Sequence, residues 1–247
     1  VGENGAGKST TINLILNLIK KDSGSIKLLG EELDDKNKNL CESIGVVLDE
    51  CNFPENLTLN EVSTVVANIY KTWDKTAFEN YRKKFNLSPD KKVKDFSRGM
   101  KMKLSIAVAL SHNSRLLILD EATSGLDPMV RDEILDIFLE FIQDETHSIF
   151  ISSHIITDLE KICDYITFIH KGKIVFSENK DDILEKYGVL KCSIDEFESI
   201  DKNIVLGVNK TSVGVSALVE KAKAPKNMLL DNAGIEDIMV FISKGDN

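Results

Sequence analysis

The chain has 247 residues, enough for one sizeable hydrophobic core and a small second unit. It carries 31 Lys and Arg against 40 Asp and Glu, a formal net charge of −9, so we expect no binding to nucleic acid or anionic lipid through broad charge attraction. Its longest apolar runs are too short to span a bilayer, and its four cysteines lack metal-ligand spacing, which favours inert thiols in a reducing compartment.

The first ten residues carry the strongest signal in the chain. They fit the phosphate-binding loop pattern G-x-x-x-x-G-K-[ST], with Gly2, Gly7, Lys8 and Ser9 in the fixed places. The glycines let backbone N–H groups turn toward phosphate oxygens, and a helix that begins near Lys8 adds the positive end of its dipole. We predict that Lys8 reaches the β- and γ-phosphates and that the Ser9 hydroxyl binds Mg²⁺. The alternative is a glycine-rich turn that happens to precede a helix.

The whole loop belongs to the predicted nucleotide-binding set. Its members are Gly2, Glu3, Asn4, Gly5, Ala6, Gly7, Lys8, Ser9 and Thr10. A phosphate loop connects a buried strand to a helix, yet only Val1 precedes it here. We therefore expect that strand, and any aromatic side chain that stacks on adenine, to lie before Val1.

The next elements alternate between helix and strand. The apolar run from Thr11 to Ile19 predicts a helix packed on nearly all sides. A turn follows, and residues 25–29 predict a short strand. Residues 31–39 are rich in charge, and we expect them to be solvated. Residues 44–48, which are rich in β-branched side chains, predict a further buried strand.

Asp49 and Glu50 directly follow that strand. Carboxylates at the carboxyl end of a buried strand lie where ligands bind in open α/β sheets. Asp49 is therefore a candidate ligand for Mg²⁺. The alternative is a plain transition from strand to loop with two solvated acids, and the local pattern favours neither.

Residues 59–94 change to a helical pattern with apolar residues on one face. This predicts a helical insertion within an α/β domain, of the kind that contacts a partner. Ser97 then stands as a natural N-cap before another helix. Either Ser97 only caps that helix, or it joins Arg98 and Gly99 as a second anion-binding site at a helix N-terminus.

The second strong signal is the run Leu116-Leu117-Ile118-Leu119-Asp120-Glu121. Four consecutive apolar residues require burial on both faces, as in a central parallel strand. The two carboxylates are then held at the ligand edge of the sheet, beside the phosphate loop. We predict that Asp120 binds Mg²⁺, directly or through water, and that Glu121 orients or deprotonates an attacking water.

Two further residues follow predicted element boundaries. Asp127 caps a helix in which Pro128 takes the first position. Residues 149–151 predict another buried strand, and His154 comes just past its end. A lone histidine is usually structural, but at the carboxyl edge of a strand His154 is also a candidate donor to a γ-phosphate.

The last third of the chain has a different pattern. Residues 165–170 and 173–176 show strand-like alternation of side chains and predict a β-hairpin. Further candidates are a short helix at 181–187, strands at 190–194, 204–208 and 213–219, and a terminal amphipathic helix through Ile235, Ile238, Met239 and Ile242. We therefore predict a main α/β domain over residues 1–187, with a helical subdomain at about 55–112, and a small C-terminal α+β domain over residues 188–247.

In this order, the motifs resemble the nucleotide-binding subunit of ATP-binding-cassette (ABC) transporters. The similarity covers about Val1 to Ser177 and rests on five ordered motifs: Gly2 to Thr10, Ser97-Arg98-Gly99, Leu116 to Glu121, Ser124 to Asp127, and His154. The resemblance implies a P-loop NTPase fold with a mainly parallel sheet. It also implies ATP and Mg²⁺ as cofactors, and a place in the cytoplasm, peripheral on the inner face of the cell membrane.

The resemblance also implies roles for single residues. Phe96 to Met100 is then the signature motif, Asp127 belongs to the loop that crosses a dimer interface, and His154 is the switch histidine. The helical stretch at 59–94 is then the subdomain that docks onto an integral-membrane partner.

The chain departs from the family pattern in three places. Asp49 stands where the family usually has Gln, Arg98 and Met100 stand where Gly and Gln are commonest, and Ala122 replaces a frequent Pro. The acidic residues near Asp49, the basic residue at the Arg98 position and the short C-terminal appendage look most like the exporter branch that handles antimicrobial peptides, antibiotics or drugs.

The leading hypothesis is ATP hydrolysis that drives transport, in a head-to-tail dimer of two copies. ATP held by Lys8, Ser9 and Asp120 of one copy is then covered by Ser97, Arg98 and Gly99 of the other, with Glu121 and His154 as catalytic residues. One rival is an ATP-driven dimerisation switch with little hydrolysis. Another is a soluble cassette ATPase that acts on ribosomes or DNA. The pair Glu121 and His154 favours the enzyme, and the acidic charge and the lack of a tandem cassette disfavour the soluble ATPase.

Overall fold

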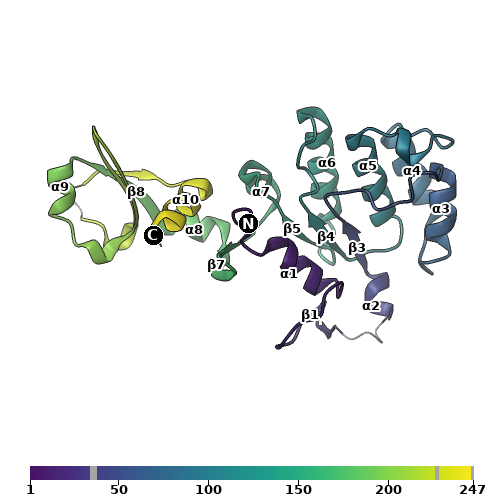
Figure 1. Ribbon diagram of the computed structural model, residues 1–247, viewed down its shortest axis with the longest axis horizontal. Helices are drawn as coiled ribbons and strands as arrows, with labels where there is room; N and C mark the ends of the chain where they lie inside the picture. Colours follow the sequence, from purple (N-terminus) through teal and green to yellow (C-terminus); the bar gives the residue numbers. More distant parts are fainter. Residues whose placement is uncertain (34–37, 226–227, 246–247) are drawn as a thin grey trace. The chain divides into compact units, whose positions relative to one another are not determined.

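The computed structural model of the chain describes residues 1–33, 38–225 and 228–245. By its internal contacts the chain divides into two compact units. Figure 1 shows the ribbon coloured by position in the sequence. The central unit is Lys8–His154, and the terminal unit is Val1–Gly7 together with Ile155–Asn247. Among the helices of the described residues, none is long and apolar enough to cross a membrane.

The central unit is an α/β structure built on a parallel sheet. Its elements are α1 (Lys8–Ile15), β1 (Lys27–Leu28), β2 (Glu31–Glu32), α2 (Lys38–Glu42), β3 (Ile44–Val47), α3 (Leu59–Ala67), α4 (Lys75–Lys84), the 3-10 helix η1 (Val93–Asp95), α5 (Arg98–Ala109), β4 (Leu116–Asp120), α6 (Pro128–Phe141) and β5 (Ser148–Ser152). Strands β3, β4 and β5 pair in parallel in that order, and β1 pairs with β2 antiparallel.

Helices cover both faces of the parallel sheet (Figure 1). β4 is the middle strand and is buried at every residue, as its apolar run predicts. On one face Ile118 packs against Ile12 of α1. On the other face β3 approaches α5 so closely that a Cβ at Gly45 would lie 2.8 Å from the carbonyl oxygen of Ala109. Only glycine allows this approach without a shift of the helix.

Two expectations of burial are wrong in the central unit. α1 ends at Ile15 because Asn17 takes a left-handed conformation, with φ of +57°, and this leaves Leu18 63% exposed. The strand expected to be buried at 149–151 is β5, which has only β4 as a neighbour among the described strands, and Phe150 is 41% exposed. An edge strand lacks the cover of a central one.

The charged stretch expected at residues 31–39 is only partly described. Its residues 31–32 form β2 and are exposed, as expected of a solvated segment. Residues 34–37 lie outside the described part of the chain.

The helical pattern at 59–94 is confirmed in its first two thirds. Thr58 and Glu61 form a capping box at the start of α3, and the Asp74 carboxylate caps α4. α3 and α4 pack against each other and against α5 around the fully buried Phe78. From residue 85 onward the segment is a loop that contains η1.

The terminal unit combines a hairpin with a small antiparallel sheet. Its elements are α7 (Ile156–Ile162), β6 (Tyr165–His170), β7 (Lys173–Asn179), α8 (Lys180–Lys186), β8 (Tyr187–Cys192), α9 (Ile194–Glu198), η2 (Lys202–Ile204), β9 (Val205–Thr211), β10 (Gly214–Glu220), η3 (Lys221–Lys223), β11 (Leu230–Asn232) and α10 (Ile235–Gly245). The predicted hairpin is β6 with β7, and the sheet order is β11-β8-β10-β9.

Both faces of the four-stranded sheet are covered. Val215 and Ala217 of β10 pack with Phe197 of α9 in one apolar cluster. On the other side α10 contacts β9, where a Cβ at Gly207 would lie 2.1 Å from the carbonyl oxygen of Phe241. The strands and the terminal helix predicted beyond residue 188 are therefore present. The domain boundary at residue 188 stays a prediction.

Candidate functional site

The phosphate loop is bound along the β6–β7 hairpin of the terminal unit. Val1 donates from its nitrogen to the Thr167 carbonyl at 2.8 Å and accepts from the Ile169 N–H at 2.9 Å, which is the pattern of parallel strands. The Ala6 carbonyl accepts from the Gly172 N–H at 3.0 Å. The hairpin therefore holds the loop near both of its ends.

Three glycines of the loop are required by its geometry. A Cβ at Gly2 would lie 2.2 Å from the Ile169 carbonyl oxygen, so no larger residue fits. Gly5 and Gly7 have φ of +81° and +109°, which other residues rarely adopt. Such conformations turn successive N–H groups to one side and form a concavity for anions.

Lys8 and Asp120 are both buried in the central unit. Lys8 is the first residue of α1 and is 9% exposed, and Asp120 is the last residue of β4 and is 7% exposed. Ile12, one turn after Lys8, packs against Ile118, which shares a face of β4 with Asp120. The predicted lysine and the predicted magnesium ligand therefore lie on the same face of the sheet. Ser9 is exposed in the first turn of α1.

The carboxyl ends of the parallel strands gather several predicted residues at one edge of the sheet. Asp49 follows β3, Glu121 follows β4 and His154 follows β5, in the order in which these strands pair. Asp120 accepts a hydrogen bond from the Ser152 hydroxyl of the paired residue on β5. Asp49 is exposed, and no hydrogen bond or ion pair joins it to the other predicted residues within the described part of the chain.

Glu121 and His154 are in direct contact. The Glu121 carboxylate lies 2.6 Å from Nδ1 of His154, and their side chains are 18% and 53% exposed. Glu121 has a φ of +52°, and its N–H donates to the Ser152 carbonyl at 3.0 Å. An ionised carboxylate is a hydrogen-bond acceptor and not a donor, so Nδ1 of His154 carries the proton of this hydrogen bond.

Ser97, Arg98 and Asp127 come together on a different pair of elements, at the N-termini of α5 and α6. The Ser97 hydroxyl accepts from the Met100 N–H at 3.3 Å, and the Asp127 carboxylate caps α6 through the Val130 N–H at 3.1 Å. Both predicted caps are therefore confirmed, with Pro128 at the start of α6.

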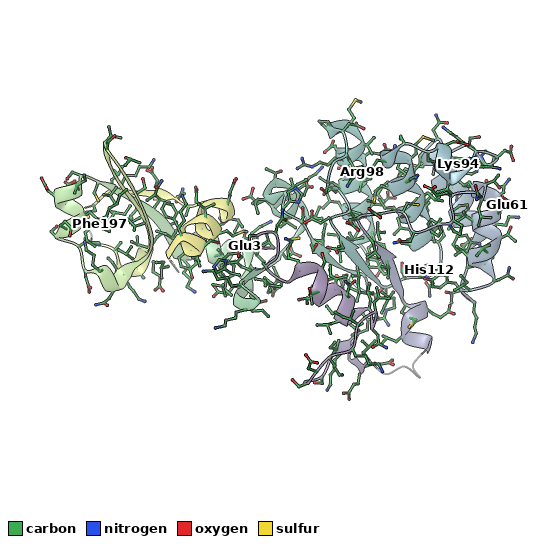
Figure 2. The ribbon with its side chains drawn as sticks, viewed as in Figure 1. Glu3, Glu61, Lys94, Arg98, His112 and Phe197 are labelled. Carbon is green, nitrogen blue, oxygen red and sulfur yellow. The ribbon has the colours of Figure 1, made fainter. Side chains whose placement is uncertain are left out.

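The Arg98 side chain turns toward its own chain. Its guanidinium covers Gly125, so that a Cβ there would lie 3.1 Å from Cζ and Nη1 of Arg98; Figure 2 labels this residue. Gly125 has a φ of +67°, and the lack of a side chain leaves room for the guanidinium. In this structure Arg98 thus bridges the starts of α5 and α6.

Two residues of the site were not predicted. Ser152 is positioned by the pairing of β4 with β5, and His170 contacts Glu3 across 167 positions of sequence. Nothing in the local pattern indicates either contact, because each depends on which strands become neighbours. Ser152 precedes His154 by two residues, and that proximity was the only available signal.

Comparisons with known proteins agree with this geometry. A family model described as "ABC transporter" matches residues 1–124. The bacitracin transport ATP-binding protein BcrA of Bacillus licheniformis is 39% identical over 177 residues, which are 71% of this chain and 58% of that protein. The lantibiotic transport ATP-binding protein SrtF of Streptococcus pyogenes is 37% identical over 182 residues, 73% of this chain and 78% of that protein.

A solved structure supports the fold. The ATP-binding subunit of an ABC transporter is 30% identical and superposes with a TM-score of 0.65, covering 74% of this chain and 78% of that one. This likeness confirms the predicted α/β fold of the P-loop NTPase class.

Proposed function

The chain belongs to the ABC transporter family, and from that membership we propose that it is the ATP-hydrolysing subunit of a transporter whose membrane subunit is a separate protein. The observation that carries the proposal is the contact of Glu121 with His154. This contact lies at the edge of the sheet where β4 ends with the buried Asp120. A carboxylate base beside a buried metal-ligand candidate is what hydrolysis of a phosphoric anhydride needs.

The residues present fit a nucleotide with magnesium. Gly5 and Gly7 give the loop its anion-binding conformation, Lys8 supplies a positive charge at a helix N-terminus, and Asp120 supplies a buried carboxylate. Ser9 and Asp120 are the proposed ligands of Mg²⁺, and Asp49 is a third candidate. When bound, ATP supplies the anhydride bond that is cleaved, and Mg²⁺ neutralises charge on the phosphate oxygens.

In the proposed mechanism Glu121 accepts a proton from the attacking water. The Nδ1–H of His154 holds the carboxylate in place by hydrogen bonding. Once Nδ1–H donates to Glu121, Nε2 of His154 donates to a phosphate only in the doubly protonated imidazolium. Ser152 orients the Asp120 carboxylate through its hydroxyl.

We also propose the partners and the location. A second copy of the chain associates head to tail, so that Ser97, Arg98 and Gly99 of one copy cover the nucleotide of the other. The complex lies on the cytoplasmic face of the membrane against an integral-membrane subunit. The names of the two relatives favour transport of a bacitracin-like or lantibiotic-like cargo, and we propose export as its direction.

The test is the Glu121→Gln variant of the full-length protein. We expect this variant to bind ATP as the wild type does and to release phosphate at least about 100-fold more slowly, because an amide cannot accept the proton. Phosphate release and ATP binding are measured in parallel. Unchanged turnover in Glu121→Gln would remove Glu121 from the catalytic role.

The rival hypothesis is a nucleotide-driven switch that hydrolyses little. It predicts that the wild type itself releases phosphate at the background rate while still binding ATP. Recovery of the protein with ribosomes or DNA, and not with an integral-membrane protein, would instead favour a soluble cassette ATPase.

A further inference from the structure

Glu3 of the phosphate loop and His170 of the hairpin lie within ion-pair distance, in a contact that no motif predicts. In the terminal unit Nδ1 of His170 lies 2.7 Å from Oε1 and 2.8 Å from Oε2 of Glu3. The His170 side chain is 5% exposed, whereas the Glu3 side chain is 40% exposed; Figure 2 labels Glu3. The hairpin therefore offers a buried donor to a side chain that reaches solvent.

The charge of Glu3 is unfavourable for an anion-binding loop. Glu3 follows Gly2 directly, and the loop that we propose to bind triphosphate thus carries a carboxylate of its own. Like charges within a few ångströms repel each other, and the repulsion is stronger where water is partly excluded. A loop that binds phosphates well must keep this carboxylate turned away from them.

The contact with His170 affects the direction of the Glu3 side chain and not the path of the loop backbone. The backbone is already held by Val1 against Thr167 and Ile169, and by Ala6 against Gly172. Gly2 is further confined beneath the Ile169 carbonyl. These backbone contacts do not set the direction of the Glu3 carboxylate, and the contact with His170 constrains it.

We propose that His170 is a positioning residue of the nucleotide site, which holds the Glu3 carboxylate on β6 so that its charge does not face the bound phosphates. The inference rests on the proposed function of the loop. It predicts that loss of the donor at position 170 harms binding only while Glu3 is charged.

The test is the affinity of the full-length protein for a fluorescent ATP analogue and for the matching ADP analogue, without turnover. His170→Leu removes the donor and places an apolar side chain in the buried position. We expect it to weaken ATP binding about five- to tenfold, and ADP binding less, because ADP carries less charge. His170→Asn, whose amide donates from near the Nδ1 position, should stay within about twofold of the wild type.

The decisive variant is His170→Leu combined with Glu3→Gln. If charge is the cause, the double variant regains affinity to within about twofold of Glu3→Gln alone. A double variant that binds as weakly as His170→Leu would overturn the proposal, because the defect would then be one of packing. Equal losses for ATP and ADP would also count against it.

Two outcomes separate this inference from the proposed function. A wild type that binds the analogue, together with a His170→Leu that binds equally well, overturns the inference and leaves the function standing. A wild type that binds neither nucleotide overturns both. If His170→Leu fails to fold in a thermal unfolding assay, His170→Gln replaces it, because its amide reaches the Nε2 position instead of Nδ1.

Discussion

At the scale of single residues, the proposed base Glu121 occupies a conformation that costs free energy. A left-handed backbone in a residue with a Cβ costs roughly 1–2 kcal/mol, and Glu121 has a φ of +52°. Its N–H is bound by the Ser152 carbonyl and its own carbonyl by the Ser124 N–H, both at 3.0 Å. These bonds hold the residue at the end of β4, and the strain is consistent with a functional position.

A second residue of interest, His112, is buried away from the proposed site. Its ring stacks on Tyr70 with centroids 3.9 Å apart, and its Nδ1 lies 3.2 Å from the Glu42 carbonyl; Figure 2 labels it. Burial lowers the pKa of His112 below its ordinary value of 6.5, partly opposed by the hydrogen bond to the Glu42 backbone. The folded protein therefore binds the His112 proton less readily than the unfolded chain does.

We predict a pH dependence of stability from this shift. Because the folded-state pKa is lower, the stability from neutral His112 is fully present above about pH 6.5 and is lost as the pH falls toward the folded-state pKa, by at most about 1.4 kcal/mol per pH unit. Urea unfolding at pH 7.5 and 5.5 measures it. His112→Phe, which keeps a ring against Tyr70, should lose less stability on acidification, and an equal loss would contradict the assignment.

At the scale of elements, the N-terminus of α5 serves a structural purpose and is proposed to serve a second one. Ser97 caps this helix, and Arg98 covers Gly125 at the approach to α6. Lys103 and Glu133 form an ion pair of 2.6 Å between the two helices. The starts of α5 and α6 are thereby held together, whether or not Ser97 also contacts a phosphate.

Two substitutions at Ser97 separate capping from phosphate contact. Ser97→Ala should destabilise the protein by about 1 kcal/mol, whereas Ser97→Asp should keep the cap. If Ser97 contacts a phosphate of the partner copy, Ser97→Asp should nevertheless lose hydrolysis through charge repulsion. Urea unfolding and phosphate release are compared for both variants. Full activity in a stable Ser97→Asp would leave capping as the only function.

The packing of β3 on α5 makes a second prediction at this scale. Gly45→Ala places a methyl group 2.8 Å from the Ala109 carbonyl and 2.6 Å from a Leu117 methyl. Overpacking of this kind costs about 1–3 kcal/mol. The control is Gly24→Ala, where φ is +83° but nothing lies within 4 Å, so that only backbone strain of roughly 1 kcal/mol is added. Equal losses in urea unfolding would mean that β3 and α5 separate readily.

At the scale of the assembly, we propose that a second copy completes the nucleotide site. The residues of the sheet edge and of the α5 N-terminus lie on different elements of the central unit. In the proposed head-to-tail dimer the second group covers the nucleotide bound by the first group of the partner. Assembly is then a consequence of nucleotide binding, because the triphosphate supplies the charge that both groups contact.

Dimerisation can be observed directly with the variant that is expected to hydrolyse ATP slowly. We expect Glu121→Gln to be monomeric without nucleotide and to form a dimer with ATP and Mg²⁺, since the bound triphosphate persists. Light scattering after size-exclusion chromatography measures the mass. Removal of Mg²⁺ with EDTA should return the monomer, and a dimer that forms equally without nucleotide would contradict the proposal.

Features that depend on neighbouring residues could be predicted from the sequence. The glycines and Lys8 of the phosphate loop, the apolar strand before Asp120, and the caps Ser97 and Asp127 were predicted because spacing and local hydrogen bonding suffice to specify them. The hairpin of β6 and β7 was predicted for the same reason.

Contacts between residues that are distant in the sequence could not be predicted and are seen only in the folded protein. Ser152 reaches Asp120 through the register of β4 with β5, and His170 reaches Glu3 because the loop lies along β6. The exposure of Phe150 likewise follows from the position of β5 in the strand order. Strand order and register arise from contacts between segments far apart in the chain, and the periodicity of any one segment carries no information about its neighbours.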